Sequence, residues 1–217
     1  IEIARLKTKY PQGGERSLIY AVTKRRLNSK KLPADVHCIV HNIDTVYAIY
    51  DAIVNGRPLT TRIVTVSGDA ISEPKNYEIK TGTYYGEIFN GHNSFETEPI
   101  KIISGGPMMG MAMAEYERVP MIKGTASLLA FEKDEVAECE TTACIRCGRC
   151  ARVCPSRIIP VMAAKAADKS DKKSFVKYNG MECCECGCCS YICPAKRPLT
   201  QMIKTMRKEI LVDRRGN

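Results

Sequence analysis

Two runs of four cysteines, each closed by a proline, are the residues of this chain best suited to carry chemistry. The first run is Cys144, Cys147, Cys150 and Cys154, and Pro155 follows it. The second run is Cys183, Cys186, Cys189 and Cys193, and Pro194 follows it. Three thiolates at every third residue can wrap one iron–sulfur cube within a tight loop, and the fourth ligand of that cube must come from elsewhere in the chain.

The spacing C-x2-C-x2-C-x3-C-P is typical of bacterial ferredoxins with two [4Fe–4S] clusters, in which the last cysteine of each run ligates the other cluster. Proline after that cysteine lacks an N–H and keeps the preceding residue out of the helical region, so the chain turns away. The crossed pattern predicts two ligand sets, which we name cluster one and cluster two. Cluster one takes Cys144, Cys147, Cys150 and Cys193, and cluster two takes Cys183, Cys186, Cys189 and Cys154.

Zinc and disulfides are the two alternatives for so many cysteines. Structural zinc is usually held by paired C-x2-C motifs or by cysteines with histidines, and three cysteines in series before a fourth fit that pattern poorly. Disulfide frameworks belong to small secreted domains. All of the twelve cysteines except Cys38 lie between Cys139 and Cys193, spaced too regularly for such a framework. The pattern favours iron–sulfur clusters.

Four cysteines remain outside the two ligand sets. They are Cys38, Cys139, Cys184 and Cys188. A free cysteine usually acts as a small hydrophobic residue, although Cys184 and Cys188 flank ligands and could tune a cluster or oxidise. Apolar side chains near the runs are expected to keep water from the clusters. These are Ile145, Val153, Ile158, Ile159 and Ile192.

The basic charge is concentrated in the cysteine-rich part. Residues 141–217 hold 16 Lys and Arg against 6 Asp and Glu, a net +10, whereas residues 1–140 hold 17 against 18. Such an excess can indicate a nucleic-acid partner. Only Phe175, Tyr178 and Tyr191 provide aromatic rings in that region, so a basic metal-stabilised binding module is a remote alternative. Part of the excess is the counter-charge of the cluster thiolates.

The order of patterns along the chain predicts an α+β protein. Residues 1–58 are expected to be helical, with helices over 17–26 and from a cap at Asn42 to Val54. Residues 59–104 read as about four strands, with 77–89 among them, and 105–135 as a glycine-rich connection. Residues 136–217 are expected to hold the clusters between helices over 157–169 and 198–212.

Several segments together resemble the RnfC family, the C subunits of Rnf ion-translocating electron-transport complexes. In chain order they are KYPQGGERSLIYAVT, LPADV, TRIVTVSGDAI, ISGGPMMG, KGT, CIRCGRC and CCECGCCSYICPAKRPL. The resemblance implies the C-terminal remnant of a flavin/NADH-type domain over 1–58, a β-grasp (soluble-ligand-binding) module over 59–104, a connecting segment over 105–135, and a helical two-cluster ferredoxin domain over 136–217. Gly13, Gly14 and Glu15 match only the tail of the flavin domain, and its upstream glycine-rich loop is absent.

By this resemblance, the chain passes electrons between NADH or flavin and membrane subunits of an ion-translocating ferredoxin:NAD oxidoreductase. This chain alone is expected only to transfer electrons, through its two [4Fe–4S] clusters, and FMN and NADH would require the upstream domain. The alternative is a soluble relative that serves a reductase such as proline reductase.

The partners implied are other electron-transport subunits, embedded in the membrane, and a redox protein such as ferredoxin or a reductase. The chain has no stretch of the ~20 apolar residues that a spanning helix needs. We therefore expect no transmembrane segment in it. The resemblance implies a cytoplasmic position on the periphery of the cell membrane, and the few aromatic residues of the basic region argue against a nucleic-acid partner.

Overall fold

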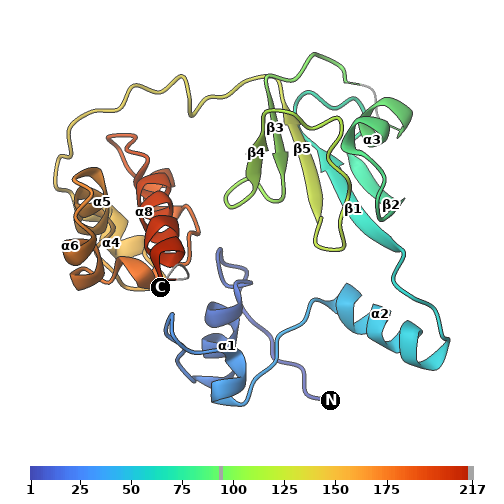
Figure 1. Ribbon diagram of the computed structural model, residues 1–217, viewed down its shortest axis with the longest axis horizontal. Helices are drawn as coiled ribbons and strands as arrows, with labels where there is room; N and C mark the ends of the chain where they lie inside the picture. The colour runs from blue at the N-terminus through green and yellow to red at the C-terminus, as the bar shows by residue number, and fades with distance from the viewer. Residues whose placement is uncertain (93–94, 215–217) are drawn as a thin grey trace. The chain divides into compact units, whose positions relative to one another are not determined.

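The chain divides into two units, one of which is assembled from both ends of the sequence. The computed structural model describes residues 1–92 and 95–214. One unit combines Ile1–Asn42 with Thr141–Asn217, and the other is Ile43–Glu140 (Figure 1). The boundaries of these units differ from the divisions at 58, 104 and 135 that the sequence suggests. The cysteine runs and the first 42 residues therefore belong to one unit.

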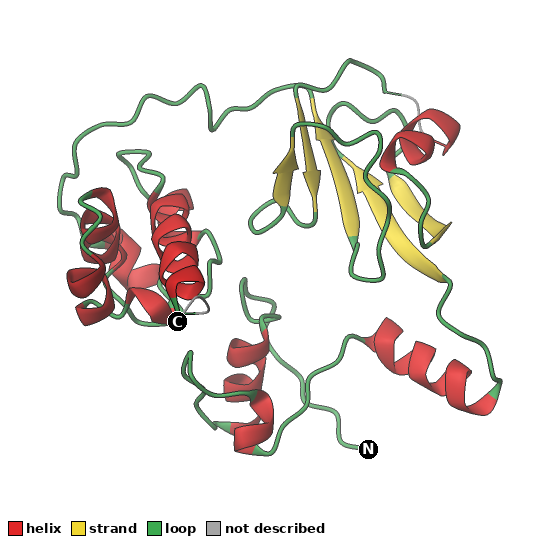
Figure 2. Ribbon diagram, viewed as in Figure 1, coloured by secondary structure: helices red, strands yellow, loops and turns green. Residues whose placement is uncertain are grey.

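The unit of residues 43–140 is built on one five-stranded sheet (Figure 2). Its strands are β1 (Thr61–Ser67), β2 (Lys75–Lys80), β3 (Lys101–Ser104), β4 (Met111–Met113) and β5 (Ser127–Phe131). The strand order is β2-β1-β5-β3-β4. The pair of β1 and β5 is parallel, with Val66 opposite Leu128, and the other pairs are antiparallel. Mixed α+β architecture, as the sequence predicts, follows from this sheet and the helices around it.

The alternating pattern of the strands produces the core of this unit. Val64 and Val66 of β1 are fully buried, as are Leu128 and Ala130 of β5. Residues two apart in a strand point to the same face. Helix α3 (Tyr85–His92) adds Ile88 and Phe89 to the same hydrophobic cluster.

One sequence prediction for this unit was wrong. The segment 77–89 was expected to be extended, but it ends β2 at Lys80 and then forms α3. Tyr85, Ile88 and Phe89 are all buried, and their spacing of three and four residues is the period of a helix. The region 105–135, expected as a glycine-rich and then extended connection, supplies β4 and β5 to the sheet.

The helix expected from Asn42 to Val54 is α2 (Ile43–Val54). None of its residues is buried. In the part of the chain that the structure describes, no helix is long and apolar enough to cross a bilayer.

The unit that holds the cysteines is helical. Its elements are α1 (Glu15–Thr23), η1 (Pro33–Val36), α4 (Arg149–Val153), α5 (Pro160–Asp168), α6 (Lys172–Lys177), η2 (Gly180–Glu182), α7 (Cys188–Tyr191) and α8 (Leu199–Asp213). Leu199, Ile203, Met206 and Ile210 follow one face of α8 and are buried. They pack with Phe175 and the alanines of α5 into a second hydrophobic cluster, which also includes Cys183 and Cys189. The core of this unit thus reaches the cysteines themselves.

Candidate metal centre

The two cysteine runs adopt the same backbone conformation. Arg146 and Glu185, at equivalent positions, both have φ of 58°. Gly148 and Gly187 follow with φ of 72° and 81°. Positive φ is uncommon for residues with a Cβ, so its recurrence at the same step of both runs indicates one loop shape used twice.

Each run then ends in the same turn. Gly148 precedes α4 and Gly187 precedes α7, so each third cysteine lies on one short helical turn. After the Cys-Pro pair, Arg157 N–H donates to the carbonyl of Cys154, and Lys196 N–H donates to that of Cys193, each over 3.1 Å. The sequence repeat is therefore also a structural repeat.

The structure brings the four residues of the cluster two set to the wall of one cavity. They are Cys154, Cys183, Cys186 and Cys189. Three of them come from the second run, and Cys154 comes from the end of the first. Ile158 and Ile203 contribute apolar walls to the same cavity. Cys184 and Cys188 line it as well, so six cysteines surround this space. The four of the cluster two set fit the number of donors that a [4Fe–4S] cluster requires.

Burial is the largest influence on the pKa of three of these thiols, whereas a hydrogen bond with Cys184 is the largest cause of the raised pKa of Cys186. Desolvation raises the pKa of Cys183 to about 11. It also raises the pKa of Cys154 and of Cys189. For Cys154, the backbone N–H groups of Ile158 and Ser156 favour the thiolate and partly oppose that rise in pKa. An apolar cage of this kind favours ligands whose negative charge is neutralised by iron.

Hydrogen bonds also reach the sulfur atoms of Cys183 and Cys189. The N–H of Glu185 donates to Sγ of Cys183 over 3.3 Å. Oγ1 of Thr200 lies 3.3 Å from Sγ of Cys189. The Ser190 hydroxyl donates to that same Thr200 oxygen over 3.0 Å, which leaves the Thr200 hydroxyl hydrogen for the sulfur. Donors on sulfur are one of the means by which a protein adjusts the potential of a cluster.

The residues of the cluster one set are more exposed. Cys144 and Cys147 are exposed, and Cys150 and Cys193 are half-buried. The N–H of Thr142 donates to the carbonyl of Ala195 over 3.1 Å. That bond joins the chain just before the first run to the chain just after the second run.

The expected apolar screen around the runs is only partly present. Ile158 is buried, as expected, and Ile192 is half-buried. Ile145, Val153 and Ile159 are instead 66%, 37% and 52% exposed. They lie on the first run and just after it.

Residues from the first 42 positions cover the second run, a relation that the sequence did not predict. The Tyr10 hydroxyl donates to the carbonyl of Cys186 over 2.7 Å. Glu182 accepts hydrogen bonds from the N–H of Ser29 and pairs with Arg16 at 3.4 Å. No periodicity or motif marks such contacts, because the partners lie more than 150 positions apart in the sequence.

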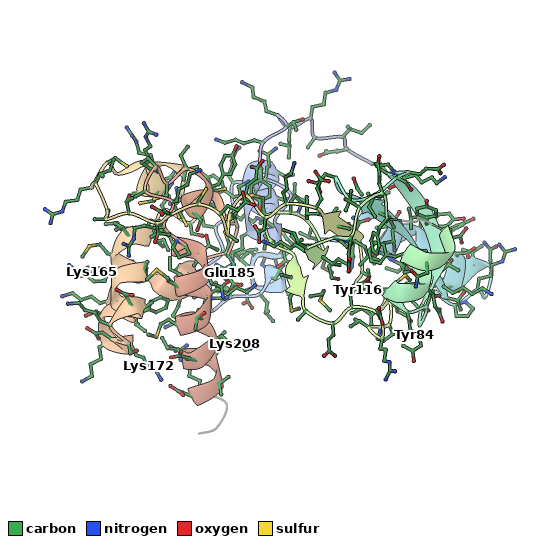
Figure 3. The ribbon with its side chains drawn as sticks, turned by 90° about the horizontal axis from the view of Figure 1, so that it is seen from above. Tyr84, Tyr116, Lys165, Lys172, Glu185 and Lys208 are labelled. Atoms are coloured by element: carbon green, nitrogen blue, oxygen red, sulfur yellow. The ribbon has the colours of Figure 1, made fainter. Side chains whose placement is uncertain are left out.

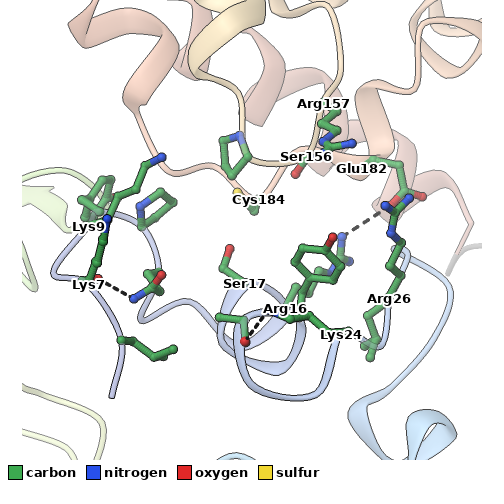
Figure 4. A pocket seen from close by; sticks show the side chains of 18 of the residues that line it. Lys7, Lys9, Arg16, Ser17, Lys24, Arg26, Ser156, Arg157, Glu182 and Cys184 are labelled. Carbon is green, nitrogen blue, oxygen red and sulfur yellow. Dashed lines mark hydrogen bonds and ion pairs between the residues drawn. The ribbon is translucent and has the colours of Figure 1, made fainter. Parts of the chain in front are cut away.

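A basic cleft lies between these first residues and the second run (Figure 4). Its cationic lining comprises Arg5, Lys7, Lys9, Arg16, Lys24, Arg26 and Arg157. Glu182 is the one carboxylate among its described lining residues, and Cys184 and Pro155 line it beside the cluster two set.

All twelve cysteines are unpaired thiols. Within residues 1–92 and 95–214, no group of three or more His, Cys, Asp or Glu side chains could hold a single metal ion.

Two segments of the chain match known protein families, one near each end. Residues 1–51 match the Nuo51 FMN-binding domain, and residues 143–196 match the 4Fe-4S dicluster domain. The resulting assignment of two [4Fe–4S] clusters agrees with the cysteine pattern.

Relatives extend the likeness over nearly the whole chain. The C subunit of the proton-translocating ferredoxin:NAD(+) oxidoreductase complex of Clostridium ljungdahlii is 44% identical over 96% of this chain and 46% of its own length. The C subunit of the Na(+)-translocating complex of Acetobacterium woodii is 41% identical over 100% of this chain and 49% of its own. The C subunit of the ion-translocating oxidoreductase complex of Pseudomonas aeruginosa is 41% identical over 96% of this chain and 27% of its own length.

The chain thus spans about half the length of the first two relatives. Over that shared part, it is similar to the C subunits of ion-translocating ferredoxin:NAD(+) oxidoreductase complexes.

Proposed function

We propose that this chain is an electron-transfer subunit that relays single electrons through two [4Fe–4S] clusters within an Rnf-type complex. The observation that carries the proposal is the meeting of Cys154 with Cys183, Cys186 and Cys189 at one cavity. A cysteine from the first run in the wall built by the second is what crossed ligation requires.

The ligand sets follow from that arrangement. Cluster two takes Cys183, Cys186, Cys189 and Cys154, and cluster one takes Cys144, Cys147, Cys150 and Cys193. For cluster one, support comes from the repeated loop conformation and from the bond between Thr142 and Ala195. When bound, each cluster supplies one-electron chemistry and exchanges no atoms with a substrate.

The protein residues around the clusters hold and insulate them. Ile158, Leu199 and Ile203 exclude water from the cluster two side. Thr200 and the N–H of Glu185 place hydrogen-bond donors on its sulfur ligands. Because such donors stabilise the added negative charge of the reduced state, they raise the reduction potential.

We also propose module identities for the rest of the chain. Residues 1–58 are the end of a flavin-binding domain, in keeping with the Nuo51 match over 1–51. The sheet from 59 onward is a β-grasp module, which the central parallel pair of β1 and β5 and the helix between β2 and β3 support. Residues 136–217 are the two-cluster ferredoxin domain. In the assembled complex, the chain lies at the cytoplasmic face of the membrane with the other subunits as partners.

The test is the metal content and redox signature of the 217-residue chain, purified without oxygen. The crossed ligand sets predict about eight iron and eight sulfide per chain, with a broad visible band that dithionite bleaches. Zinc in place of iron would contradict the proposal.

A further inference from the structure

The two cysteine runs share one backbone, yet their surroundings differ. We name residues 144–157 the arginine loop, because Arg146, Arg149, Arg152 and Arg157 are its charged residues and it contains no Lys, Asp or Glu. The equivalent residues 183–196 contain one acid, Glu185, and one base, Lys196. Arg207 pairs with that Glu185.

The two runs also differ in how far their residues are buried. Residues 141–149 are all exposed, whereas 183–190 are buried or half-buried. Tyr10, Arg16 and Ser29 cover the second run through bonds to Cys186 and Glu182. The first two cysteines of the first run are therefore exposed, whereas the second run lies against the first residues of the chain.

The cations of the two loops have different surroundings. By the crossed ligation, each loop supplies three thiolates to one cluster and one to the other. The loop 183–196 has one base of its own, and the basic cleft, which Cys184 lines, brings further cations from the first residues of the chain beside it. In the arginine loop, Arg157 lines that cleft, whereas Arg146, Arg149 and Arg152 are exposed and are not among its lining residues. These three arginines are therefore available to a negatively charged partner.

The type of cation points to a protein surface. Arginine forms forked, paired hydrogen bonds with carboxylates, and it is enriched where proteins meet, whereas lysine is depleted there. The arginine loop has four arginines and no lysine. The helices that follow carry Lys165, Lys169, Lys172, Lys173 and Lys177 and no arginine. Figure 3 shows Lys165 and Lys172 at the outer surface of these helices.

Exposed apolar side chains accompany the arginines. Ile145 and Val153 lie within the loop, and Ile159 lies two residues beyond it, and all three are exposed. Apolar contacts surrounded by charge are the usual composition of an interface between proteins that associate transiently. Exposure of Cys144 and Cys147 would bring a docked protein close to cluster one.

We propose that the arginine loop is the docking surface for an acidic redox protein, which exchanges electrons with the chain at cluster one. This inference rests on the proposed function and adds to it a surface, a class of partner and the cluster at which the partner acts. In each exchange one electron passes between cluster one and a one-electron centre of the partner. One centre is oxidised as the other is reduced, and no atom or proton is transferred.

The test uses the cluster-loaded chain and an acidic two-cluster ferredoxin as the probe, with electron exchange followed by stopped-flow absorbance at low and high salt. The test variant carries Arg146→Glu, Arg149→Glu and Arg152→Glu. The matched control carries Lys169→Glu, Lys173→Glu and Lys177→Glu, which change the net charge equally on the same unit. A second test variant, with glutamine at the same three arginines, removes charge without reversing it.

We expect the glutamate variant to slow exchange on the order of tenfold or more at low salt. The glutamine variant should act in the same direction but less, and the lysine control should change the rate less than about twofold. High salt should reduce the differences, because it screens exposed charges.

Two results would overturn the inference. One is exchange that the arginine changes leave unaltered, and the other is an equal loss in the lysine control. Iron and sulfide content and the EPR spectrum of every variant keep this question apart from the proposed function. A parent chain without iron would end the proposed function and the inference with it, whereas normal clusters with unaltered exchange would end the inference alone.

Discussion

At the scale of single residues, the properties of the clusters depend on what touches the sulfur atoms. Cys189 Sγ lies 3.3 Å from the Thr200 hydroxyl, which the Ser190 hydroxyl orients. Cys154 contributes from the other run to the same cavity as Cys189. These contacts allow each ligand and each donor to be tested separately.

Replacing Thr200 by Val should lower the reduction potential of cluster two. Valine has nearly the same shape but no hydroxyl, so the sulfur of Cys189 loses a donor that stabilises the reduced state. A hydrogen bond of about 1 kcal/mol corresponds to a shift on the order of tens of millivolts. A redox titration followed by EPR measures it. Thr200→Ser keeps the hydroxyl and should stay near the parent value, so an equal shift in both variants would contradict the assignment.

Removing the last cysteine of one run should damage the cluster assigned to the other run. Cys154→Ala takes a ligand from the cavity of Cys183, Cys186 and Cys189, so the signal of cluster two should be lost or altered first. Cys193→Ala should affect cluster one in the same way. Iron content and EPR of the two variants give the answer. Loss of cluster one in Cys154→Ala would refute the crossed assignment.

At the scale of elements, the site depends on how short helices hold the cysteine loops. Gly180 begins η2, three residues before Cys183, and the fully buried ring of Phe175 lies against it. A Cβ at this glycine would be 2.4 Å from the Phe175 ring. The lack of a side chain there allows α6 and the second run to pack together.

Gly180→Ala should therefore destabilise the helical unit by about 1–3 kcal/mol, the usual cost of overpacking a core. Displacement of the ring or of η2 should also lower the iron content of cluster two. Denaturant unfolding and iron analysis measure the two effects. Gly13→Ala, in the same unit with no heavy atom within 4 Å of the added Cβ, is the control and should change stability by less than about 0.5 kcal/mol.

The sheet has an ion pair that makes its stability depend on pH. Lys101 is the first residue of β3, and its Nζ lies 2.6 Å from Oδ2 of Asp134. The hydrogen bond from Lys101 holds the pKa of the Asp134 carboxyl below its ordinary value of 3.8. Stabilisation from this pair is thus fully present above that value and is lost as the pH falls through the lower pKa of the folded state.

Asp134→Asn should lower the stability of the sheet by about 1 kcal/mol at pH 7, because both side chains are partly exposed. In strong acid the parent carboxyl is protonated, so parent and variant should become similar. Hydrogen exchange of peptides from β3 and β5 at the two pH values measures the difference. A gap that persists unchanged in acid would show that the ion pair is not its cause.

Comparison of elements also shows what the sequence can predict here. Period and caps predicted α2, α5 and α8 closely, since each has a clear helical pattern. The strand prediction over 77–89 was wrong. The adjacent aromatic residues Tyr84 and Tyr85 are typical of strands, but the buried positions follow the period of a helix. The cysteine spacing predicted which residues could be ligands. It could not predict that Tyr10 and Ser29 cover the second run, because such contacts depend on the tertiary fold alone.

At the scale of the whole molecule, the chain joins two ends of its sequence around one pair of clusters. The first 42 residues, which match part of an FMN-binding domain over 1–51, pack on the second run. The first run faces outward with its arginines. In the relay that we propose, this difference would give electrons one side at which to arrive and another at which to leave.

The most direct test of two linked clusters is the EPR spectrum of the anaerobically purified chain after dithionite reduction, read together with its iron and sulfide content. Two linked clusters should give about eight iron and eight sulfide per chain and two [4Fe–4S]⁺ signals broadened by each other's proximity. A chain that binds one tetrahedral zinc ion, or that shows cysteines joined in disulfides and no reducible iron, would contradict it.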